Sequence, residues 1–216
     1  MTYEGLRLSF RNKIYLPLTA DLRRKKIKNY DFTIISNNCW GGTIYESYHL
    51  KKNSPTVGMF FMAADYIKFL SDIHHYLESK LVFIEPENSK YKEELSKDSR
   101  WGHYPIGKID DIELFFLHYH SREEAMDKWT RRCKRINWNK LLVKFNDQNG
   151  CSDELIRKFV ELPYKNKICF VVSDTEKIDE IIYKIKSPQK YNHVMASYEP
   201  FGANRTVNIN NIINDL

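Results

Sequence analysis

DFTIISNNCWGG, residues 31–42, is the stretch of the chain that decides the fold. Its first half, residues 31–36, is a β-branched and aromatic run typical of a short buried strand. The second half, Asn37-Asn38-Cys39-Trp40-Gly41-Gly42, has the Asn and Gly residues of a turn. Thr43 then suits the N-cap of a short helix through His49. The stretch therefore predicts a strand, a turn and a helix in succession.

Working outward, hydrophobic spacing predicts further helices and strands in alternation. The expected helices cover residues 3–27, 63–77, 122–135, 153–161 and 176–185, and the expected strands cover residues 80–84, 104–109, 113–119, 141–145 and 167–172. Alternation of this kind favours an α/β fold in one domain, with a mixed, mostly parallel sheet flanked by helices. We expect a basic N-terminal helix (1–29), an α/β core domain (30–185) and a C-terminal extension (186–216).

The length of 216 residues suits a single domain. The first 22 residues contain no secretory signal, and no window is apolar enough for a spanning helix. We therefore expect a cytoplasmic protein. The four cysteines, at positions 39, 133, 151 and 169, form no close pair, so neither a disulfide framework nor a structural zinc site is expected. We predict no bound metal and no cofactor.

The net charge of +6 is concentrated at the N-terminus. Residues 1–28 carry eight basic and two acidic side chains, whereas the rest of the chain is balanced. A neutral body argues against a nucleic-acid partner, which needs a basic face on the folded domain. The basic segment is a candidate for peripheral contact with the anionic inner face of a membrane. The alternative is an ordinary solvated helix.

Cys39 is the first candidate for chemistry. Ligand sites in parallel sheets lie beyond the carboxyl ends of the strands, where Cys39, Asp147 and Asp174 are all expected. A helix N-terminus beside Cys39 would lower the pKa of its thiol, and backbone N–H groups could hold an oxyanion. Gly41 and Gly42 would let a substrate approach closely. The alternative is a buried cysteine that only packs.

His118 is the natural partner of a cysteine nucleophile. The run Phe115 to His120 is expected to place His118 and His120 on one face of a strand and Tyr119 on the other. As general base, His118 would need an orienting group, which Asp147, Asp174 or Asn146 could supply. The rival readings are a strand-end histidine with no catalytic role and a metal site, for which further ligands are missing.

Basic residues also gather on the helix predicted for residues 122–135. Arg131 and Arg135 are four residues apart and so share one helix face, to which Lys128 adds. Such a face could hold the phosphates of a nucleotide sugar or a carrier lipid, together with Arg132. The alternative is a solvated face paired with nearby acidic residues. Neither a Gly-rich phosphate loop nor a Gly-x-Ser-x-Gly motif occurs in the sequence.

Several separated motifs resemble a bacterial family catalogued as domain of unknown function 1919. They are residues 35–42 (ISNNCWGG), Ser54-Pro55-Thr56, Tyr104-Pro105-Ile106-Gly107, His118-Tyr119 and Lys128-Trp129, with Arg132, Arg135, Ile136 and Asn137. The resemblance spans residues 30–185. Members of that family are similar to proteins encoded in capsule and exopolysaccharide gene clusters. The resemblance therefore implies a role in the synthesis of surface polysaccharide, without naming a reaction.

A weaker likeness concerns mechanism. A cysteine just after the first strand, a histidine after an apolar strand and an Arg-rich helix are similar to the arrangement in papain-like cysteine acyltransferases. That likeness implies Cys39 as nucleophile and His118 as base. The Phe-Asp-Trp run typical of that group is missing, and Ser54-Pro55-Thr56 and Met59-Phe60-Phe61 stand roughly in its place.

Together these observations predict a transferase of surface polysaccharide synthesis. Its acceptor would be a saccharide or lipid-linked saccharide, and its donor an activated acyl group or a nucleotide sugar. The predicted catalytic residues are Cys39, His118 and Asp147. The predicted substrate-binding residues are Asn37, Asn38, Trp40, Gly41, Gly42, Tyr119, His120, Arg131, Arg132 and Arg135. A glycosyltransferase without covalent catalysis and a non-enzymatic assembly protein at the membrane are the alternatives.

Overall fold

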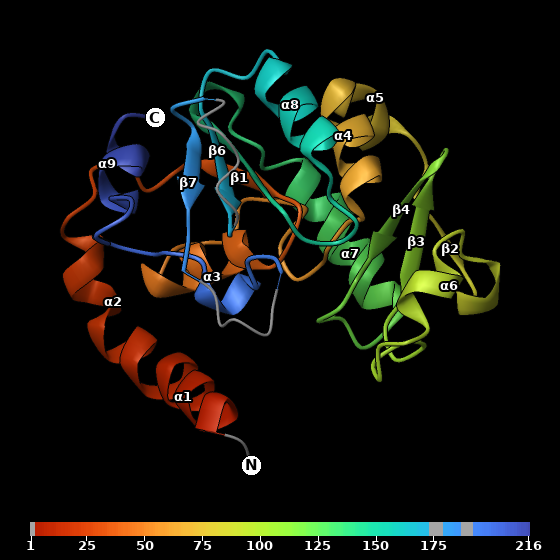
Figure 1. The fold of residues 1–216 in the computed structure, drawn as a ribbon, viewed down its shortest axis with the longest axis horizontal. Coiled ribbons are helices and arrows are strands. Elements are labelled where there is room, and N and C mark those ends of the chain that lie inside the picture. Colours follow the sequence, from red (N-terminus) through yellow and green to blue (C-terminus); the bar gives the residue numbers. More distant parts are fainter. Residues whose placement is uncertain (1–2, 173–178, 187–191) are drawn as a thin grey trace.

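The computed structural model describes residues 3–172, 179–186 and 192–216 (Figure 1). The chain begins with a long helical segment made of α1 (Tyr3–Phe10), a π-helical turn (Arg11–Tyr15) and α2 (Leu16–Arg24). This confirms the helix expected at the N-terminus. Pro17 has no N–H to donate, and it is the second residue of α2, which follows the turn in which the hydrogen-bond pattern widens to i→i+5.

A four-stranded parallel sheet forms the centre of the molecule. Its strands are β1 (Thr33–Ser36), β5 (Leu141–Asn146), β6 (Lys167–Val171) and β7 (Ile182–Lys184). They lie in the order β1-β5-β6-β7, and every neighbouring pair is parallel. The fold is therefore α/β with a mostly parallel arrangement of strands, as predicted.

The remaining described strands make a second, antiparallel sheet. It contains β2 (Val82–Ile84), β3 (Ile106–Ile109) and β4 (Ile112–Phe115) in that order. The tight turn between β3 and β4 places Asp110 in the left-handed region, with φ of 50°. The two strands expected in this part of the chain pair as a hairpin, but β4 ends at Phe115, so the strand expected to continue to Tyr119 does not.

Helices and short helical turns connect the strands. The helices are α3 (Trp40–Ser47), α4 (Ala63–Ser71), α5 (Ile73–Glu78), α6 (Lys92–Leu95), α7 (Arg122–Cys133), α8 (Asp153–Glu161) and α9 (Ile209–Asn214). Short 3₁₀ turns cover Pro86–Asn88, Trp138–Lys140 and Ala196–Tyr198. None of the helices in the described part of the chain is long and apolar enough to cross a bilayer.

Apolar side chains cover both faces of the parallel sheet. Ile35, Val143 and Cys169 pack on one side with residues of α4, α7 and α8. Their neighbours Ile34, Leu142 and Ile168 pack on the other side with α3 and with residues from the C-terminal part of the chain. Successive strand residues point to opposite faces, so continuous apolar strands require this double cover. Figure 1 shows α4 and α8 on one side and α3 and α9 on the other.

Two local predictions were wrong. The helix expected from Thr43 begins earlier, because Trp40 N–H is already capped by Asn38 Oδ1 (3.1 Å), and Cys39 is the N-cap residue. In place of the end of the helix expected at 176–185, residues 182–184 form β7, whose Ile and Tyr side chains suit a strand beside β6. The start of that predicted helix, like Asp174, lies outside the described residues.

The predicted C-terminal extension contributes to the core. Val194, Val207, Ile209 and Ile213 are buried with Phe32 and other residues on the α3 side of the sheet. Hydrogen bonds from Asn29 Nδ2 to Ile213 O (2.8 Å) and from Lys28 N to Asn214 Oδ1 (2.6 Å) tie α9 to the segment after α2. The segment after α2 and the C-terminal helix are thus joined on one side of the molecule.

Candidate functional site

A cleft of about 900 Å³ opens at the carboxyl ends of β1 and β5. Its walls come from the start of α3, the turns around Phe60 and His118, the loop after β5 and residues 192–197. We call it the Cys39 cleft. It is where ligand sites of parallel α/β folds are found. The cleft brings together Cys39, His118 and Asp147, the three residues predicted to be catalytic.

Cys39 lies at the N-cap of α3 with its side chain partly open to the cleft. Its Sγ atom is 3.9 Å from the carbonyl oxygen of Met59. Burial and then the nearby Glu199 carboxylate raise the pKa of the Cys39 thiol to about 12, against smaller opposing effects of Lys144 and Arg100. The expected lowering of this pKa by the helix N-terminus was therefore wrong, since loss of water outweighs the backbone dipoles. The resting site holds a neutral thiol.

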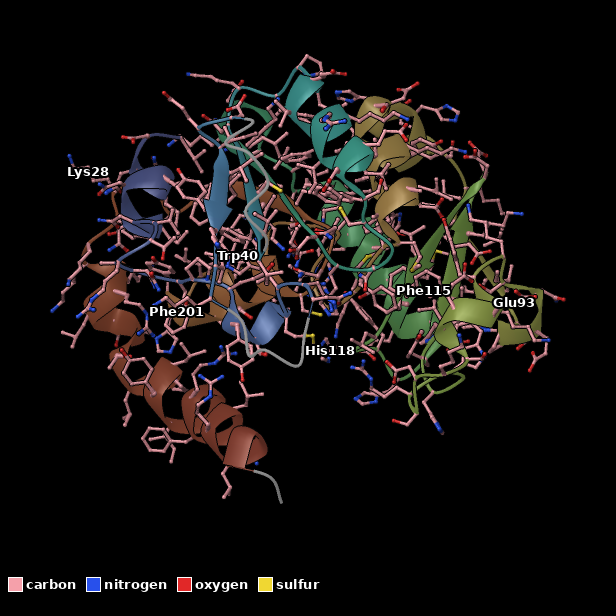
Figure 2. All side chains as sticks on the ribbon, in the orientation of Figure 1. Lys28, Trp40, Glu93, Phe115, His118 and Phe201 are labelled. Carbon is pink, nitrogen blue, oxygen red and sulfur yellow. The ribbon has the colours of Figure 1, made fainter. Side chains whose placement is uncertain are left out.

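His118 lies in the turn that follows β4, where that part of the molecule faces α3 (Figure 2). Its backbone N–H donates to Gly58 O (3.0 Å). Cys39 and His118 therefore contact consecutive residues, Met59 and Gly58, of the same segment. Partial burial and the Arg100 cation lower the pKa of His118, so its ring is neutral near pH 7 and able to accept a proton.

Asp147 binds backbone groups. Its two carboxylate oxygens accept from Val172 N and Val194 N, each at 2.7 Å. These bonds join the ends of β5 and β6 to the segment after residue 192. Among the described residues, no hydrogen bond connects Asp147 to His118. Asn146, the other predicted orienting group, bonds instead to Asn37, Val194 and Glu199.

A buried polar cluster lies directly beneath the cleft. Lys144 of β5 forms an ion pair with Glu199, and neither side chain has any exposed surface. Lys144 Nζ also donates to Asn38 Oδ1 (2.9 Å), and Glu199 Oε1 accepts from Asn146 Nδ2 (2.9 Å). Asn37 completes the cluster through Asn146 Oδ1 (2.7 Å). Of the five, Asn38 lines the cleft.

The cluster carries one uncompensated atom. Glu199 Oε2 is buried and has no hydrogen-bond partner among the described residues. Burial raises the pKa of Glu199 and lowers the pKa of Lys144, and each partner's charge opposes the other's shift. Sequence reasoning missed both residues. A lysine inside the apolar run LLVKFN was a usable signal, whereas nothing local marks Glu199 in the polar segment before Pro200.

Three of the predicted substrate contacts are internal packing residues. Trp40 is fully buried, and its Nε1–H donates to Pro200 O (2.7 Å). A Cβ on Gly41 would come within 3.3 Å of Ile34 and Ser36, and one on Gly42 within 3.2 Å of Val57. These glycines allow α3 to lie close against β1 and the segment after residue 53. The prediction that Gly41 and Gly42 let a substrate approach closely was therefore wrong.

Tyr119 and His120 lie apart from the cleft. Tyr119 is buried, and its hydroxyl donates to Val57 O and accepts from Arg132 (2.6 Å). His120 is exposed and lines a different small hollow beside Arg122. The predicted common strand face for His118 and His120 was wrong because the chain has already turned away from β4.

The predicted phosphate-binding arginines of α7 do not line the Cys39 cleft. Arg132 is buried and donates to Val57 O (3.1 Å), which fixes the segment after residue 54. Arg131 is exposed and pairs with Asp127 four residues earlier. Arg131 and Arg135 line a shallow surface hollow of their own. The cations that the structure places at the Cys39 cleft are Arg11 and Arg100.

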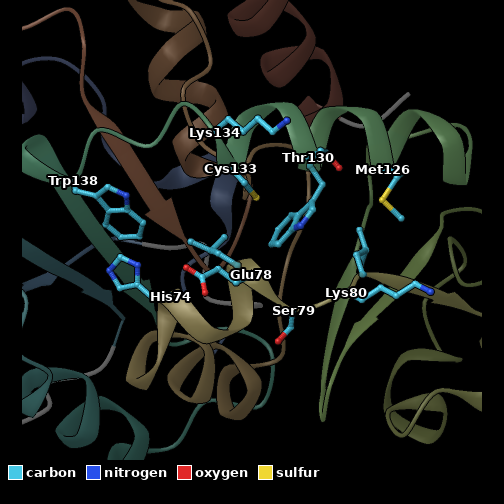
Figure 3. Close-up of a pocket in the computed structure, with 12 residues that line it drawn as sticks. His74, Glu78, Ser79, Lys80, Met126, Thr130, Cys133, Lys134 and Trp138 are labelled. Atoms are coloured by element: carbon cyan, nitrogen blue, oxygen red, sulfur yellow. The ribbon is translucent and has the colours of Figure 1, made fainter.

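A second hollow, of about 610 Å³, lies between α5 and α7 (Figure 3). Its walls include Leu77, Met126, Trp129 and Cys133, and the rings of His74 and Trp138 stack at one end with 4.3 Å between their centres. This hollow is mostly apolar and lies away from the strand ends. Among the described residues, no group of three His, Cys, Asp or Glu side chains is placed to hold a metal ion.

Comparison with known proteins finds similarity over most of the chain. Residues 10–214 match the family model described as "Domain of unknown function (DUF1919)". A protein of Haemophilus influenzae, described as uncharacterised, is 33% identical over 181 residues, which are 84% of this chain and 81% of that protein. The family match includes the π-helical turn, α2 and the C-terminal segment that supplies Glu199.

Proposed function

The chain belongs to the DUF1919 family, and we propose that it is a transferase of bacterial surface polysaccharide synthesis that moves an acyl group to a saccharide through Cys39. The observation that carries this proposal is the shared cleft of Cys39 and His118. Cys39, whose side chain is partly open to the cleft and whose Sγ lies against Met59 O, and His118, whose backbone N–H donates to Gly58 O and whose ring is neutral, supply the two groups that such a transfer needs.

The proposed reaction proceeds in two transfers. With the donor bound, the Cys39 thiol gives its proton to His118 while Sγ attacks the acyl carbon of a thioester. The donor's thiol leaves with the proton from His118, and the acyl group remains on Sγ. A sugar hydroxyl then attacks this acyl carbon and gives its proton to His118. The sugar ester leaves, and the returning proton restores the Cys39 thiol.

The raised pKa of Cys39 supports proton transfer that is coupled to attack. A thiol with a pKa of about 12 is almost entirely protonated at neutral pH. A base is therefore required, and the lowered pKa of His118 keeps that base in its neutral form. The amide groups of Gln148, Asn149 and Asn192 line the same cleft and suit the hydroxyl groups of a saccharide.

The test is formation of an acyl-enzyme. The purified chain is incubated with acetyl-coenzyme A, and the intact mass of the protein is measured. We expect one acetyl group on wild type, none on Cys39→Ser, and a normal adduct on Cys133→Ser, whose thiol lies outside the cleft and also has a pKa of about 12. Unchanged acetylation of Cys39→Ser would refute the covalent mechanism.

A second candidate, glycosyl transfer from a nucleotide sugar, rests on a different observation. Arg11 and Arg100 line the cleft, and guanidinium groups bind diphosphate well. Calorimetry of wild type with a panel of nucleotide sugars and with acetyl-coenzyme A separates the two. Binding of a nucleotide sugar that is lost in Arg100→Gln, with no binding of the thioester, would favour glycosyl transfer.

A further inference from the structure

Besides Tyr15, five large apolar side chains are exposed on the N-terminal helical segment. They are Leu6, Phe10, Ile14, Leu18 and Leu22. Leu18 and Leu22 are 75% and 62% exposed, and the other three are 45% to 58% exposed. We call these five residues the N-terminal stripe. An apolar patch of this length on one element marks an interaction surface.

The backbone keeps the stripe together. Its members recur every four residues, and in an α-helix each such step turns the side chain by about 40°. The π-helical turn Arg11–Tyr15 lies in the middle of the stripe. Its wider turn offsets part of that rotation. All five side chains can thus face the same general direction over the length of α1 and α2.

The opposite side of α2 is already occupied. Leu16 and Ala20 are buried. Arg23, on the same side, donates through Nε to Ser47 O of α3 (2.7 Å). Leu18 and Leu22 follow Leu16 and Ala20 by two residues, which is about half a helical turn. The stripe therefore faces away from the body, and α1 extends beyond it (Figure 1).

Cations lie beside the stripe. Lys25 and Lys26 come directly after α2 ends at Arg24, three and four residues beyond Leu22, and so lie at the end of the stripe. Their ammonium groups, and that of Lys13, are exposed and make no hydrogen bond or ion pair with the described residues. Residues 1–28 hold eight basic and two acidic side chains. An apolar face with free lysines beside it is the pattern of a helix that lies in a membrane interface.

We propose that residues 6–26 bind the surface of an anionic lipid bilayer, with the N-terminal stripe buried at the boundary between headgroups and acyl chains. A second copy of this chain fits the stripe less well, because its N-terminal segment would bring the same excess of positive charge. Anionic headgroups complement that charge. This inference does not depend on the chemistry proposed for Cys39.

Binding would place the Cys39 cleft close to the lipid. Arg11 lies in the same helical segment, lines the cleft and donates to Ser197 O. The guanidinium of Arg7 lies over the ring of Tyr198, 4.5 Å from its centre. The helix that carries the stripe is thus fastened to the segment that forms one wall of the cleft, so a lipid-linked saccharide could reach the cleft from the membrane.

The test is sedimentation of the full chain with sucrose-loaded vesicles. Vesicles of phosphatidylcholine with phosphatidylglycerol are compared with phosphatidylcholine alone. We expect wild type to bind the anionic vesicles, and Leu18→Asp/Leu22→Asp to bind about tenfold more weakly or less. Arg157→Gln/Lys158→Gln on α8 makes the same change in net charge at exposed positions, and we expect it to bind within about twofold of wild type.

Two outcomes would overturn the proposal. One is equal binding by wild type and Leu18→Asp/Leu22→Asp. The other is an absence of vesicle binding combined with a dimer, seen by light scattering, that the same double substitution dissociates. Because both leucines are exposed, circular dichroism should show wild-type melting for the variant, which separates lost binding from lost folding.

Discussion

Removing either member of the buried Lys144–Glu199 pair should destabilise the fold far more than its single ion pair suggests. Lys144→Met and Glu199→Gln keep the approximate volume of each side chain but leave its partner without a counter-charge. Both side chains are fully buried. Breaking a buried pair from one side costs about 3–5 kcal/mol, because an uncompensated charge remains in a medium of low polarity.

The double variant Lys144→Met/Glu199→Gln should recover part of that loss. It leaves no buried charge, although Asn38 and Asn146 lose some of their bonding partners. We expect the double variant to be at least about 2 kcal/mol more stable than the sum of the two single effects predicts. A matched surface pair, Glu154–Lys158 on α8, is exposed at both ends, and Lys158→Met should cost no more than about 0.5 kcal/mol.

The assay is urea unfolding followed by circular dichroism and tryptophan fluorescence. In thermal melts of the same variants, a loss of 3–5 kcal/mol lowers the melting temperature by about 6–20 °C for a chain of this size. Single variants that each lose less than about 1 kcal/mol, or a double variant whose loss equals the sum of the two, would refute the reasoning. Either result would mean that the pair is already neutral or solvated in the folded chain.

Three further predictions follow from the structure. At pH 8, a thiol pKa of about 12 instead of 9.0 lowers the thiolate fraction of Cys39 about a thousandfold, while the greater nucleophilicity of such a thiolate raises its reaction rate about 20- to 30-fold. Iodoacetamide should therefore modify Cys39 about 30- to 50-fold more slowly in the folded chain than in the unfolded chain. Peptide mass spectrometry measures the two rates, and equal rates would contradict the raised pKa. Because the pKa of His118 is lowered from its usual value near 6.5, the folded chain binds fewer protons at this ring than the unfolded chain does in mildly acidic solution. The contribution of His118 to the free energy of unfolding is therefore complete above about pH 6.5 and falls as the pH is lowered. His118→Gln should flatten the pH dependence of the free energy of unfolding in urea below about pH 6.5, and an unchanged slope would count against this prediction. Gly107→Ala should destabilise the chain by about 1–3 kcal/mol, because its Cβ would lie 2.7 Å from both Leu81 and Phe116; wild-type melting would show that the hairpin has room to move.

Much of the fold could be read from local sequence. The apolar runs of residues 31–36, 141–145 and 167–172 predicted three of the parallel strands, because a strand covered on both faces is apolar along its whole length. Ser121 and Ser152 directly precede the helices predicted at 122–135 and 153–161, and both side chains cap those helices in the structure. Predictions from local sequence were wrong for segments whose structure depends on contacts with residues distant in the chain. β7 forms by pairing with β6, and β4 ends where the chain turns toward Gly58.

The sequence by itself determined which residues carry reactive groups and which strand ends they follow. It placed Cys39 and Asp147 at the sheet's carboxyl edge, and that edge is part of the cleft. Only the tertiary structure decided their environment. Glu199, 160 residues from Cys39, enters beneath the cleft and helps raise the pKa of the thiol, and Arg132 turns inward to hold Val57 instead of facing a phosphate. The physical reason is that burial and opposing charge are set by residues distant in the chain, whereas strand and helix formation depend largely on neighbours.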